Sequence, residues 1–565
     1  MELGLSVETE GGESAPPNPI EARWDQAFPR LTPAQLARLE PHGTRKRTRK
    51  GEILAEPGER HRLMLVVLSG SVEIVRPGLA GEELIVVHTA GHFSGEMSTL
   101  RGAASVVRAR VREEGEVLAI DGENLRAIVQ TDAELSEILM RAFILRRVGL
   151  IASGSGDVIL IGSGHSAGTL RLQQFLTRNA FPYISIDVER DPSARALLDR
   201  FHVSAGDIPV VLCRGEKMLK NPGNEELAAC LGMNPQIDDA KIRDLVVIGA
   251  GPAGLAAAVY GASEGLDVLV IETSAPGGQA GSSSKIENYL GFPTGISGQA
   301  LAGRALVQAQ KFGAEVTVAS SAVRLRCEQR PHEIDLTDGR VVRARAVVVA
   351  TGAEYRRLAL DNLERFLGVG VYYAATSVEA RLCKAEEVIV VGGGNSAGQA
   401  AVFLAGGCRH VHLLVRSGGL ADSMSRYLIR RIEESSNITL HTRTQVSALE
   451  GGTRLERVTW RNGAGAETRD IGHVFLMTGA VPNTRWLQGC VALDDKGFVR
   501  TGSDLHPEDL APAQWAQPRP PHLFETSRPG IFAVGDVRCG STKRVAAAVG
   551  EGSACVQLVH RVLHE

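Results

Sequence analysis

Two glycine-rich turns carry the clearest chemistry in this sequence. The first, GAGPAG, covers Gly249–Gly254 after an apolar run. In such a turn the first glycine permits a tight bend, the second lets backbone N–H groups approach a pyrophosphate, and the third lets a helix pack on the strand. Glu272 ends the next apolar run, where a carboxylate can accept ribose hydroxyls. This spacing predicts a dinucleotide with a free 2′-hydroxyl, such as FAD or NAD, held by Gly249, Gly251, Pro252, Ala253, Gly254 and Glu272.

The second turn, GGGNSA, is followed by a strand that ends in an arginine instead of a carboxylate. A guanidinium at this place can pair with a 2′-phosphate, so NADPH is the favoured second ligand, with a solvated arginine as the alternative. Arg426 and Arg430, on the helical stretch that follows, are further candidates to assist. The predicted second site contains Gly392, Gly394, Asn395, Ser396, Ala397 and Arg416.

Each turn lies inside a strand–turn–helix–strand segment, residues 244–272 and 387–416. About thirty residues is the length of one βαβ unit. A site for FAD and a site for NADPH in one chain indicate a hydride relay, in which the coenzymes carry the chemistry and the protein aligns them. The sequence accordingly has no evident Ser/His/Asp or Cys/His constellation.

Composition limits the other function classes. The 565 residues are 44% hydrophobic and 22% charged, which excludes a disordered chain. The net charge of −3 gives no reason to expect nucleic acid or an anionic membrane as partner. Residues 245–262 are apolar, but their glycine turn favours a buried strand and helix over a membrane span. An N-terminus without an apolar signal, and eight scattered cysteines with no C-x-x-C pair, favour a cytoplasmic location.

The chain reads as a multidomain protein. Short β-type runs extend to about Arg126, a helical pattern covers 132–151, and a β-α-β-α-β-β-α order follows the linker 153–157. The predicted parts are a flexible tail (1–30), a β-roll (31–152), an α/β domain (157–235), and an α/β Rossmann-like module with two dinucleotide-binding domains (242–360 with 485–565, and 361–484).

The C-terminal module resembles the low-molecular-weight thioredoxin-reductase family of FAD/NAD(P)H flavoproteins. The resemblance rests on ordered motifs: GAGPAG, GGQ, IENYLGFP, ATGA, GGGNSA, TGAVPNT, GIFAVGD and KRVAAAVGEG. It implies an NADPH domain inserted into the FAD domain, and a homodimer. It also implies that Gln279 and Asn288 line the flavin, that Asp536 binds its ribityl or pyrophosphate part, and that Arg544–Ala546 contact the isoalloxazine. Further cofactor-binding positions implied by the motifs are Gly278, Ala350, Gly352 and Gly535.

One departure from that family changes the expected chemistry. The family's disulfide reductases have a C-x-x-C pair before the second glycine turn, and here these positions hold Ala374 and Ser377. Neither a methyl group nor a hydroxyl can form a disulfide or attack one as a thiolate does. Cys383 lies nearby, but a single thiol cannot replace the pair. Cys539, close to Asp536, is a slightly better candidate for a redox thiol, although a plain small residue in a tight loop is the favoured interpretation.

The middle α/β domain resembles thioredoxin and glutaredoxin, with an unrelated βαβ module as the alternative. Pro209 stands where that fold has a cis-proline, and the helix that would begin with redox cysteines begins with Ser166–Thr169 instead. Cys213 and Cys230 read as core residues. The resemblance therefore implies a thioredoxin-like domain without its dithiol.

The N-terminal β-roll resembles a cyclic-nucleotide-binding domain of the Crp/Fnr type. Gly95 and Glu96 match its phosphate-binding cassette, but the arginine for the cyclic phosphate falls on Ala103, and Arg101 is offset. An unpaired buried anion is costly, so we expect dimerisation or protein docking here more than cyclic-nucleotide binding. No helix-turn-helix pattern follows, so DNA binding is not expected.

Two other patterns have simpler explanations. Cys408, His410 and His412 alternate along a predicted strand, but three residues inside a nucleotide-binding unit do not predict a metal site. The basic run 44–50 is best explained as a solvated strand edge.

The sequence thus predicts an NADPH-dependent FAD oxidoreductase that passes electrons to a non-dithiol acceptor, either a small molecule or a protein. One alternative is a redox- or ligand-sensing flavoprotein with little turnover. Another is a thioredoxin-disulfide reductase, which the missing C-x-x-C disfavours.

Overall fold

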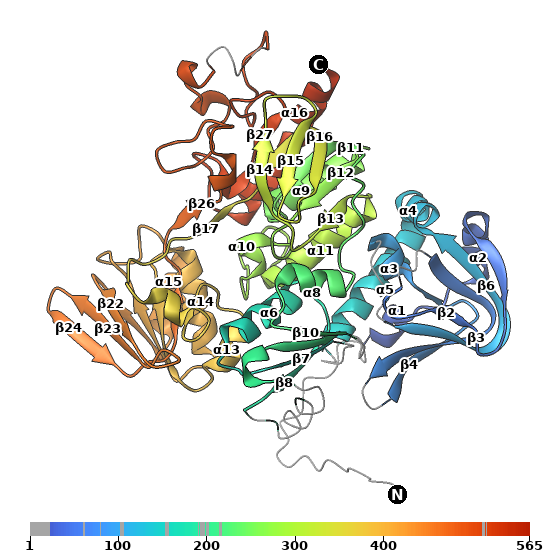
Figure 1. Ribbon diagram of the computed structural model, residues 1–565, viewed down its shortest axis with the longest axis horizontal. Coiled ribbons are helices and arrows are strands. Elements are labelled where there is room, and N and C mark those ends of the chain that lie inside the picture. Colours follow the sequence, from blue (N-terminus) through green and yellow to red (C-terminus); the bar gives the residue numbers. More distant parts are fainter. Residues whose placement is uncertain are drawn as a thin grey trace, which may run out of the picture.

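The computed structural model arranges the chain as four packed parts, with the N-terminal sheet at one side and the second nucleotide-binding sheet at the other (Figure 1). A smaller sheet lies between these two, beside the largest sheet. The structure describes residues 23–59, 63–78, 81–101, 105, 107–152, 158–189, 191, 198, 203–213, 217–510, 515 and 517–565.

The N-terminal part is an antiparallel sheet of order β1-β6-β3-β4, with β2 paired to β6 and β5 to β3. Its strands are β1 (Thr44–Thr48), β2 (Ile53–Ala55), β3 (Leu63–Gly78), β4 (Gly81–Thr89), β5 (Phe93–Ser94) and β6 (Arg108–Asp121). Its helices are α1 (Trp24–Ala27), α2 (Pro33–Leu39), α3 (Glu96–Arg101), α4 (Gly122–Thr131) and α5 (Ala133–Ala152). The predicted β-rich region and the helix after it are therefore both present.

Three details of this part test the sequence predictions. The flexible tail was predicted to reach residue 30, but this end point is wrong because α1 is helical and Ala27 is buried. Residues 1–22 lie outside the described residues. The β pattern also ends earlier than Arg126, because the Asp121 side chain accepts the Asn124 N–H and begins α4. The basic run forms β1, an exposed edge strand whose Arg45 pairs with Glu40, as predicted.

Glu96, the predicted ribose ligand, forms an ion pair with Arg146 inside the protein. It is buried, and Nη1 of Arg146 on α5 lies 2.9 Å from each of its carboxylate oxygens. The Arg146 guanidinium also lies over the rings of Phe28 and Phe93. Ala103 and the side chain of Arg101 lie outside the described residues.

The middle part is a four-stranded sheet of order β10-β9-β7-β8, in which β8 is parallel to β7 and β9 is antiparallel to it. Its elements are β7 (Val158–Gly162), α6 (Ala167–Arg178), β8 (Ile184–Asp187), β9 (Val210–Cys213), β10 (Lys217–Lys220) and α8 (Asn224–Cys230). The Ile208–Pro209 bond is cis, and Cys213 is buried, both as predicted. The predicted linker 153–157 and the helix expected near residues 194–201 fall outside the described residues, apart from residue 198.

The largest sheet has the order β13-β12-β11-β16-β15-β14, and β27 pairs with β16. Its strands are β11 (Ile242–Ile248), β12 (Val268–Ile271), β13 (Glu315–Thr317), β14 (Ala322–Arg326), β15 (His332–Leu336), β16 (Val341–Val349) and β27 (Ile531–Ala533). Leu245 and Val247 of β11 pack on α9 (Pro252–Ser263), α11 (Gly298–Lys311) and α16 (Val545–His564), while Val246 and Ile248 face a second apolar cluster. Both faces of the parallel strands are buried, as such sheets require.

The second nucleotide-binding sheet is inserted in the chain between β16 and β27. Its order is β18-β25-β19-β20-β21, and the central strands are parallel. Its strands are β18 (Val371–Tyr372), β19 (Glu387–Val391), β20 (His410–Leu414), β21 (Ile438–His441) and β25 (Val474–Leu476). Helices α13 (Ser377–Leu382), α14 (Asn395–Ala405) and α15 (Arg426–Glu434) belong to it. A three-stranded sheet accompanies it, formed by β22 (Gln445–Glu450), β23 (Arg457–Asn462) and β24 (Gly465–Arg469).

The two nucleotide-binding sheets are joined where the chain crosses between them. There β17 (Ala353–Tyr355) pairs antiparallel with β26 (Ala480–Pro482). Asn483 Nδ2 donates to the Thr351 carbonyl at 3.0 Å, and Thr351 Oγ1 donates to the Asn483 carbonyl at 2.9 Å. The outgoing and returning chains are therefore tied to each other.

Helix α6 of the middle part contacts both nucleotide-binding parts (Figure 1). Gln174 Nε2 donates to Glu379 on α13 at 2.5 Å, and Leu170 packs in the same apolar cluster as Tyr372. Near the end of the helix, the Thr177 carbonyl accepts a hydrogen bond from Gln299 Nε2 on α11. The middle part therefore bridges the two parts that carry the glycine turns.

The apolar stretch 245–262 forms most of β11, the glycine turn and most of α9, as predicted. Of the helices in the described part of the chain, none combines the length and hydropathy needed to cross a membrane.

The pH dependence of stability provides a test of packing in the largest sheet. His332 begins β15, and burial lowers its pKa to about 4. The unfolded chain binds a proton near its ordinary pKa of about 6.5, so the unfolded state holds more protons between these values and stability falls as the pH falls.

We expect His332 to cost about 2 kcal/mol of folding free energy between pH 8 and pH 5. Denaturant unfolding of wild type and of His332→Gln at both pH values measures this difference. An equal pH-dependent loss in the two proteins would show that the imidazole is not held neutral.

Candidate functional site

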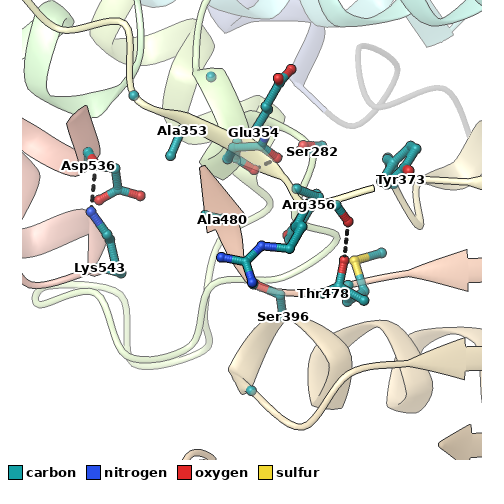
Figure 2. Close-up of a pocket in the computed structure, with 18 of the residues that line it drawn as sticks. Ser282, Ala353, Glu354, Arg356, Tyr373, Ser396, Thr478, Ala480, Asp536 and Lys543 are labelled. Atoms are coloured by element: carbon teal, nitrogen blue, oxygen red, sulfur yellow. Dashed lines mark hydrogen bonds between the residues drawn. The ribbon is translucent and has the colours of Figure 1, made fainter. Parts of the chain in front are cut away.

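A single cavity of about 2120 Å³ lies between the two nucleotide-binding sheets and reaches both glycine turns. Ala353 and Glu354 of β17 and Ala480 of β26 lie in its wall, where the chain crosses between the sheets (Figure 2). A cavity of this size is large enough for more than one extended ligand.

The first glycine turn has the geometry that its sequence requires. Gly249 has a φ of +105°, and a Cβ there would lie 2.4 Å from the Ala350 carbonyl oxygen. A Cβ on Gly254 would lie 1.9 Å from the Gly249 carbonyl oxygen, because α9 packs tightly on β11. By contrast, a Cβ on Gly251 would meet nothing within 4 Å, and this residue lines the cavity. The turn therefore leaves open space at the N-terminus of α9, where backbone N–H groups favour an anion.

Glu272 follows β12 and lines the cavity, but its carboxylate already serves the backbone. Oε2 accepts the Ala250 N–H at 2.7 Å, and Oε1 accepts the N–H groups of Ser274 and Ala275. The sequence predicted that this carboxylate would accept ribose hydroxyls. The structure adds a second task, because the same side chain holds the turn against the loop after β12.

Most of the predicted site residues line this one cavity. They are Gly249, Gly251, Pro252, Ala253, Glu272, Gly278, Gln279, Asn288, Ala350, Gly352, Gly392, Gly394, Asn395, Ser396, Arg416, Gly535, Asp536, Arg544, Val545 and Ala546. Gly254 and Ala397 are not in the wall, because both are buried where α9 and α14 pack against their strands.

Asp536 and Lys543 form a polar corner of the cavity (Figure 2). Lys543 Nζ donates to the Asp536 backbone carbonyl at 2.6 Å. Burial raises the pKa of the Asp536 carboxyl and lowers that of the Lys543 ammonium. Lys543 thus bonds the backbone carbonyl of Asp536, and the Asp536 carboxylate is not the acceptor of that bond.

The second turn mirrors the first. Gly392 has a φ of +145°, and a Cβ there would lie 2.3 Å from the Met477 carbonyl oxygen. Asn395 at the start of α14 accepts the Ser425 N–H at 2.8 Å, so its amide positions a loop. Arg416 lies two residues after the end of β20 and directly follows the buried Val415. It is exposed and lines the cavity. Arg426 and Arg430 on α15 are outside the wall, so the structure does not place them with Arg416.

Sequence reasoning missed several cations in the wall: Arg178, Arg356, Arg357 and Arg461. Arg356 follows β17, and its side chain extends toward Ser396 at the start of α14 (Figure 2). Arg356, Arg416 and Arg461 make no ion pair with any carboxylate in the described part of the chain. The one available sequence signal was the Arg356–Arg357 pair, which two residues separate from the ATGA motif.

The positions discussed for redox chemistry are separated. Ala374 lines the cavity, whereas Ser377 is an exposed residue at the start of α13. Cys383 is buried outside the wall, and its hydrogen bond with Cys408 together with burial raises its pKa. Cys539 is also outside the wall, and burial raises its pKa. Neither thiol faces the cavity as a ready thiolate.

The cysteines are less dispersed than the sequence suggested. Cys327 and Cys490, 163 residues apart, form a disulfide with a Cα–Cα distance of 5.9 Å. Cys383 and Cys408 have their sulfur atoms 3.7 Å apart without forming a bond.

Cys408, His410 and His412 turn to different partners. Cys408 donates to the Cys383 carbonyl, His410 contacts Thr439, and Nδ1 of His412 lies 3.1 Å from Nε2 of His441. Over the residues that the structure describes, no three His, Cys, Asp or Glu side chains form a cluster suited to a metal ion.

Known proteins match two parts of the chain. Residues 45–132 match the model of the cyclic nucleotide-binding domain, and residues 243–552 match that of pyridine nucleotide-disulphide oxidoreductase. A thioredoxin reductase of Listeria monocytogenes is 30% identical over 331 residues, which are 58% of this chain and 96% of that protein. NADPH-dependent thioredoxin reductase 3 of Arabidopsis thaliana is 32% identical over 57% of this chain and 58% of its own length.

Solved structures give the same result for the same part of the chain. The thioredoxin reductase of Lactococcus lactis has a TM-score of 0.51 and 25% identity, covering 57% of this chain and 99% of that chain. Since the oxidoreductase model covers more than half of the 565 residues, the chain belongs to the pyridine nucleotide-disulphide oxidoreductase family and is an enzyme of that family, with a cyclic nucleotide-binding domain ahead of it.

Proposed function

We propose that this enzyme oxidises NADPH through FAD and delivers electrons to an acceptor that is not a dithiol. The observation that carries the proposal is the single cavity that joins both glycine turns and has Ala374 in its wall. Enzymes of this family use FAD and a nicotinamide dinucleotide, and two turns opening into one space fit two such ligands.

The residues around the first turn fit FAD. Gly251 leaves room for a pyrophosphate at the N-terminus of α9, and Glu272 lies beside that room. Gln279, Asn288 and Asp536 supply amide and carboxylate groups in the same wall. The segment Arg544–Ala546, at the start of α16, adds a second helix N-terminus, which favours negative charge on a bound ring.

The residues around the second turn fit NADPH. The backbone at Gly392–Gly394 leads into α14, with Gly394 as its N-cap. Arg416 stands past the end of β20 in the cavity wall, and its guanidinium makes no ion pair with a described residue. A guanidinium here can pair with a 2′-phosphate, which NADH lacks. FAD held at the first turn would supply two-electron chemistry: it would accept a hydride from a nicotinamide held at the second turn and pass both electrons to the acceptor.

The protein's part is to align these groups and to offer the acceptor direct access. Ala374 presents only a methyl group to the cavity, so it adds no sulfur relay there. We also propose that the middle part is a thioredoxin-like domain, on the basis of its sheet order and its cis-proline. Its helix α6 is capped by Ser166 and has no cysteine, and Cys213 is in the core.

A redox-sensing role is the second candidate, because the N-terminal part contacts the largest nucleotide-binding part. Lys311 Nζ on α11 donates to Ser136 Oγ on α5 at 3.0 Å. A change at the flavin could be transmitted through such contacts. Cyclic-nucleotide binding is not favoured, because Arg146 already neutralises Glu96. The homodimer and the cytoplasmic location stay predictions.

Anaerobic titration with NADPH tests the proposed function. We expect the flavin absorbance to bleach, and one member of a panel of quinones, ferredoxins and flavodoxins to reoxidise it much faster than oxygen does. NADPH-dependent reduction of a thioredoxin disulfide is expected to be absent. Slow oxidase activity with a redox-dependent change in shape would instead support the sensor.

The first turn provides a matched pair of variants. Gly251→Ala should fold normally but lose FAD, because its methyl group enters the open space of the turn. Gly254→Ala should fail to fold normally, because its methyl group would collide with the Gly249 carbonyl. Circular dichroism and the flavin-to-protein absorbance ratio measure the two effects. Gly550→Ala on α16, with no atom within 4 Å of its Cβ, is the control, and undiminished FAD in Gly251→Ala would refute the assignment.

Arg416 provides a test of coenzyme choice. Arg416→Gln should weaken NADPH binding by about 10- to 100-fold, the value of a charge-assisted hydrogen bond, and leave NADH nearly unchanged. Arg426→Gln, on α15 outside the cavity wall, should change neither. Steady-state KM values for both coenzymes measure this. An equal effect on NADPH and NADH would rule out contact with the 2′-phosphate.

A further inference from the structure

The middle part contributes a side chain to the wall of the dinucleotide cavity. Helix α6 ends at Arg178, and this residue lines the cavity together with Glu272, Gly278 and Gln279 of the first nucleotide-binding part. The Arg178 Nη2 donates to the Gly278 carbonyl at 3.0 Å. Next to it, Asn179 Nδ2 donates to the Ser274 carbonyl at 3.1 Å. The helix end is therefore anchored on the loop that carries the predicted cofactor residues.

Arg178 is partly buried, and its guanidinium has unused hydrogen-bonding capacity. Its Nε has no hydrogen-bond partner, and Arg178 makes no ion pair in the described part of the chain. The charges of Glu272 and Glu379 act on it, but both carboxylates have other partners. Glu272 accepts three backbone N–H groups, and Glu379 accepts Gln174 Nε2 and the Thr376 hydroxyl. A buried cation with a free donor is costly unless an anion compensates it. Arg178 therefore brings to this part of the cavity wall a positive charge that an anionic ligand could compensate.

The position of Arg178 indicates which anion that is. Gly278, which accepts its hydrogen bond, packs on the phosphate turn: a Cβ on Gly278 would lie 3.1 Å from Gly251 Cα. Gly251 is the residue that leaves open space at the N-terminus of α9. Arg178 and that helix N-terminus therefore border the same part of the cavity from two different domains.

We propose that Arg178 binds the pyrophosphate of the dinucleotide in the first site, so that the middle domain forms part of the cofactor site. This inference rests on the proposed function, because it takes FAD as the ligand of the first turn. It gives the domain without redox cysteines a direct task. It also couples dinucleotide binding to the docking of α6. A bound dinucleotide stabilises the docked position of α6, and docking strengthens dinucleotide binding by the same factor.

The test compares arginine variants on one helix. Arg178→Met removes the charge in the cavity wall, while Arg171→Met removes a charge whose guanidinium bonds Asn224 and the Pro222 carbonyl inside the middle domain. Apoprotein of each full-length variant is titrated with FAD, and the quenching of flavin fluorescence gives Kd. We expect R178M to bind FAD about 10- to 100-fold more weakly than wild type, and R171M to stay within about threefold.

A phosphate-specific readout separates contact from a structural effect. R178M should weaken the binding of ADP, which has the pyrophosphate, and leave that of adenosine unchanged. Should R178M not fold, R178K against R171K makes the same comparison, with at least about threefold weaker FAD binding expected for R178K. Equal FAD affinities at the two positions, in a wild type that binds FAD, overturn the inference alone. Wild-type apoprotein that takes up no FAD overturns the proposed function as well.

Discussion

The antiparallel pairing of β17 with β26 is the contact on which the site depends. The two glycine turns belong to separate sheets, and at this crossing the outgoing chain is hydrogen-bonded to the returning one. Thr351 and Asn483 exchange two hydrogen bonds there, and Thr478 Oγ1 donates to the Arg356 carbonyl. Because residues of both strands lie in the cavity wall, the link that joins the two sheets also helps to set the distance between the two glycine turns.

Helix α6 adds a second connection between the same two domains. Its first turns contact the part with the second glycine turn through Leu170 and Gln174. Its last residues contact the part with the first glycine turn through Thr177 and Arg178. A domain held by one narrow crossing can rotate, whereas one also braced by a packed helix has fewer arrangements available. The middle domain therefore limits how the two nucleotide sites approach each other.

Local requirements explain why so much of the site was predictable from the sequence. The positive φ of Gly249 and the close approach of Gly254 are properties of a six-residue turn, and only glycine meets them. Arg178 and Arg461 gave no such signal, because each enters the wall from an element distant in the sequence. The same holds for Cys327 and Cys490, whose pairing depends on how the sheet and a later loop pack. The flexible tail was predicted to extend too far for another reason. The polar N-terminal stretch gave no sign that Ala27 and Phe28 would be buried.

The loss of two dithiol sites and the docking of α6 have one physical explanation. In the proposed thioredoxin-like domain, redox cysteines would stand at the start of α6. At that place Ala167 packs against Gly368 of the part with the second glycine turn, where a Cβ on Gly368 would be 3.1 Å from Ala167 Cα. A disulfide-exchange site must be reached by its partner, and a helix fixed at both ends cannot move to meet one. A sulfur relay through this domain and a stable contact of α6 with both nucleotide domains are therefore competing uses of one helix. The contacts of α6 with both domains agree with the second use. Under the proposals above, α6 would then serve cofactor binding and domain position, and electrons would leave from the flavin itself.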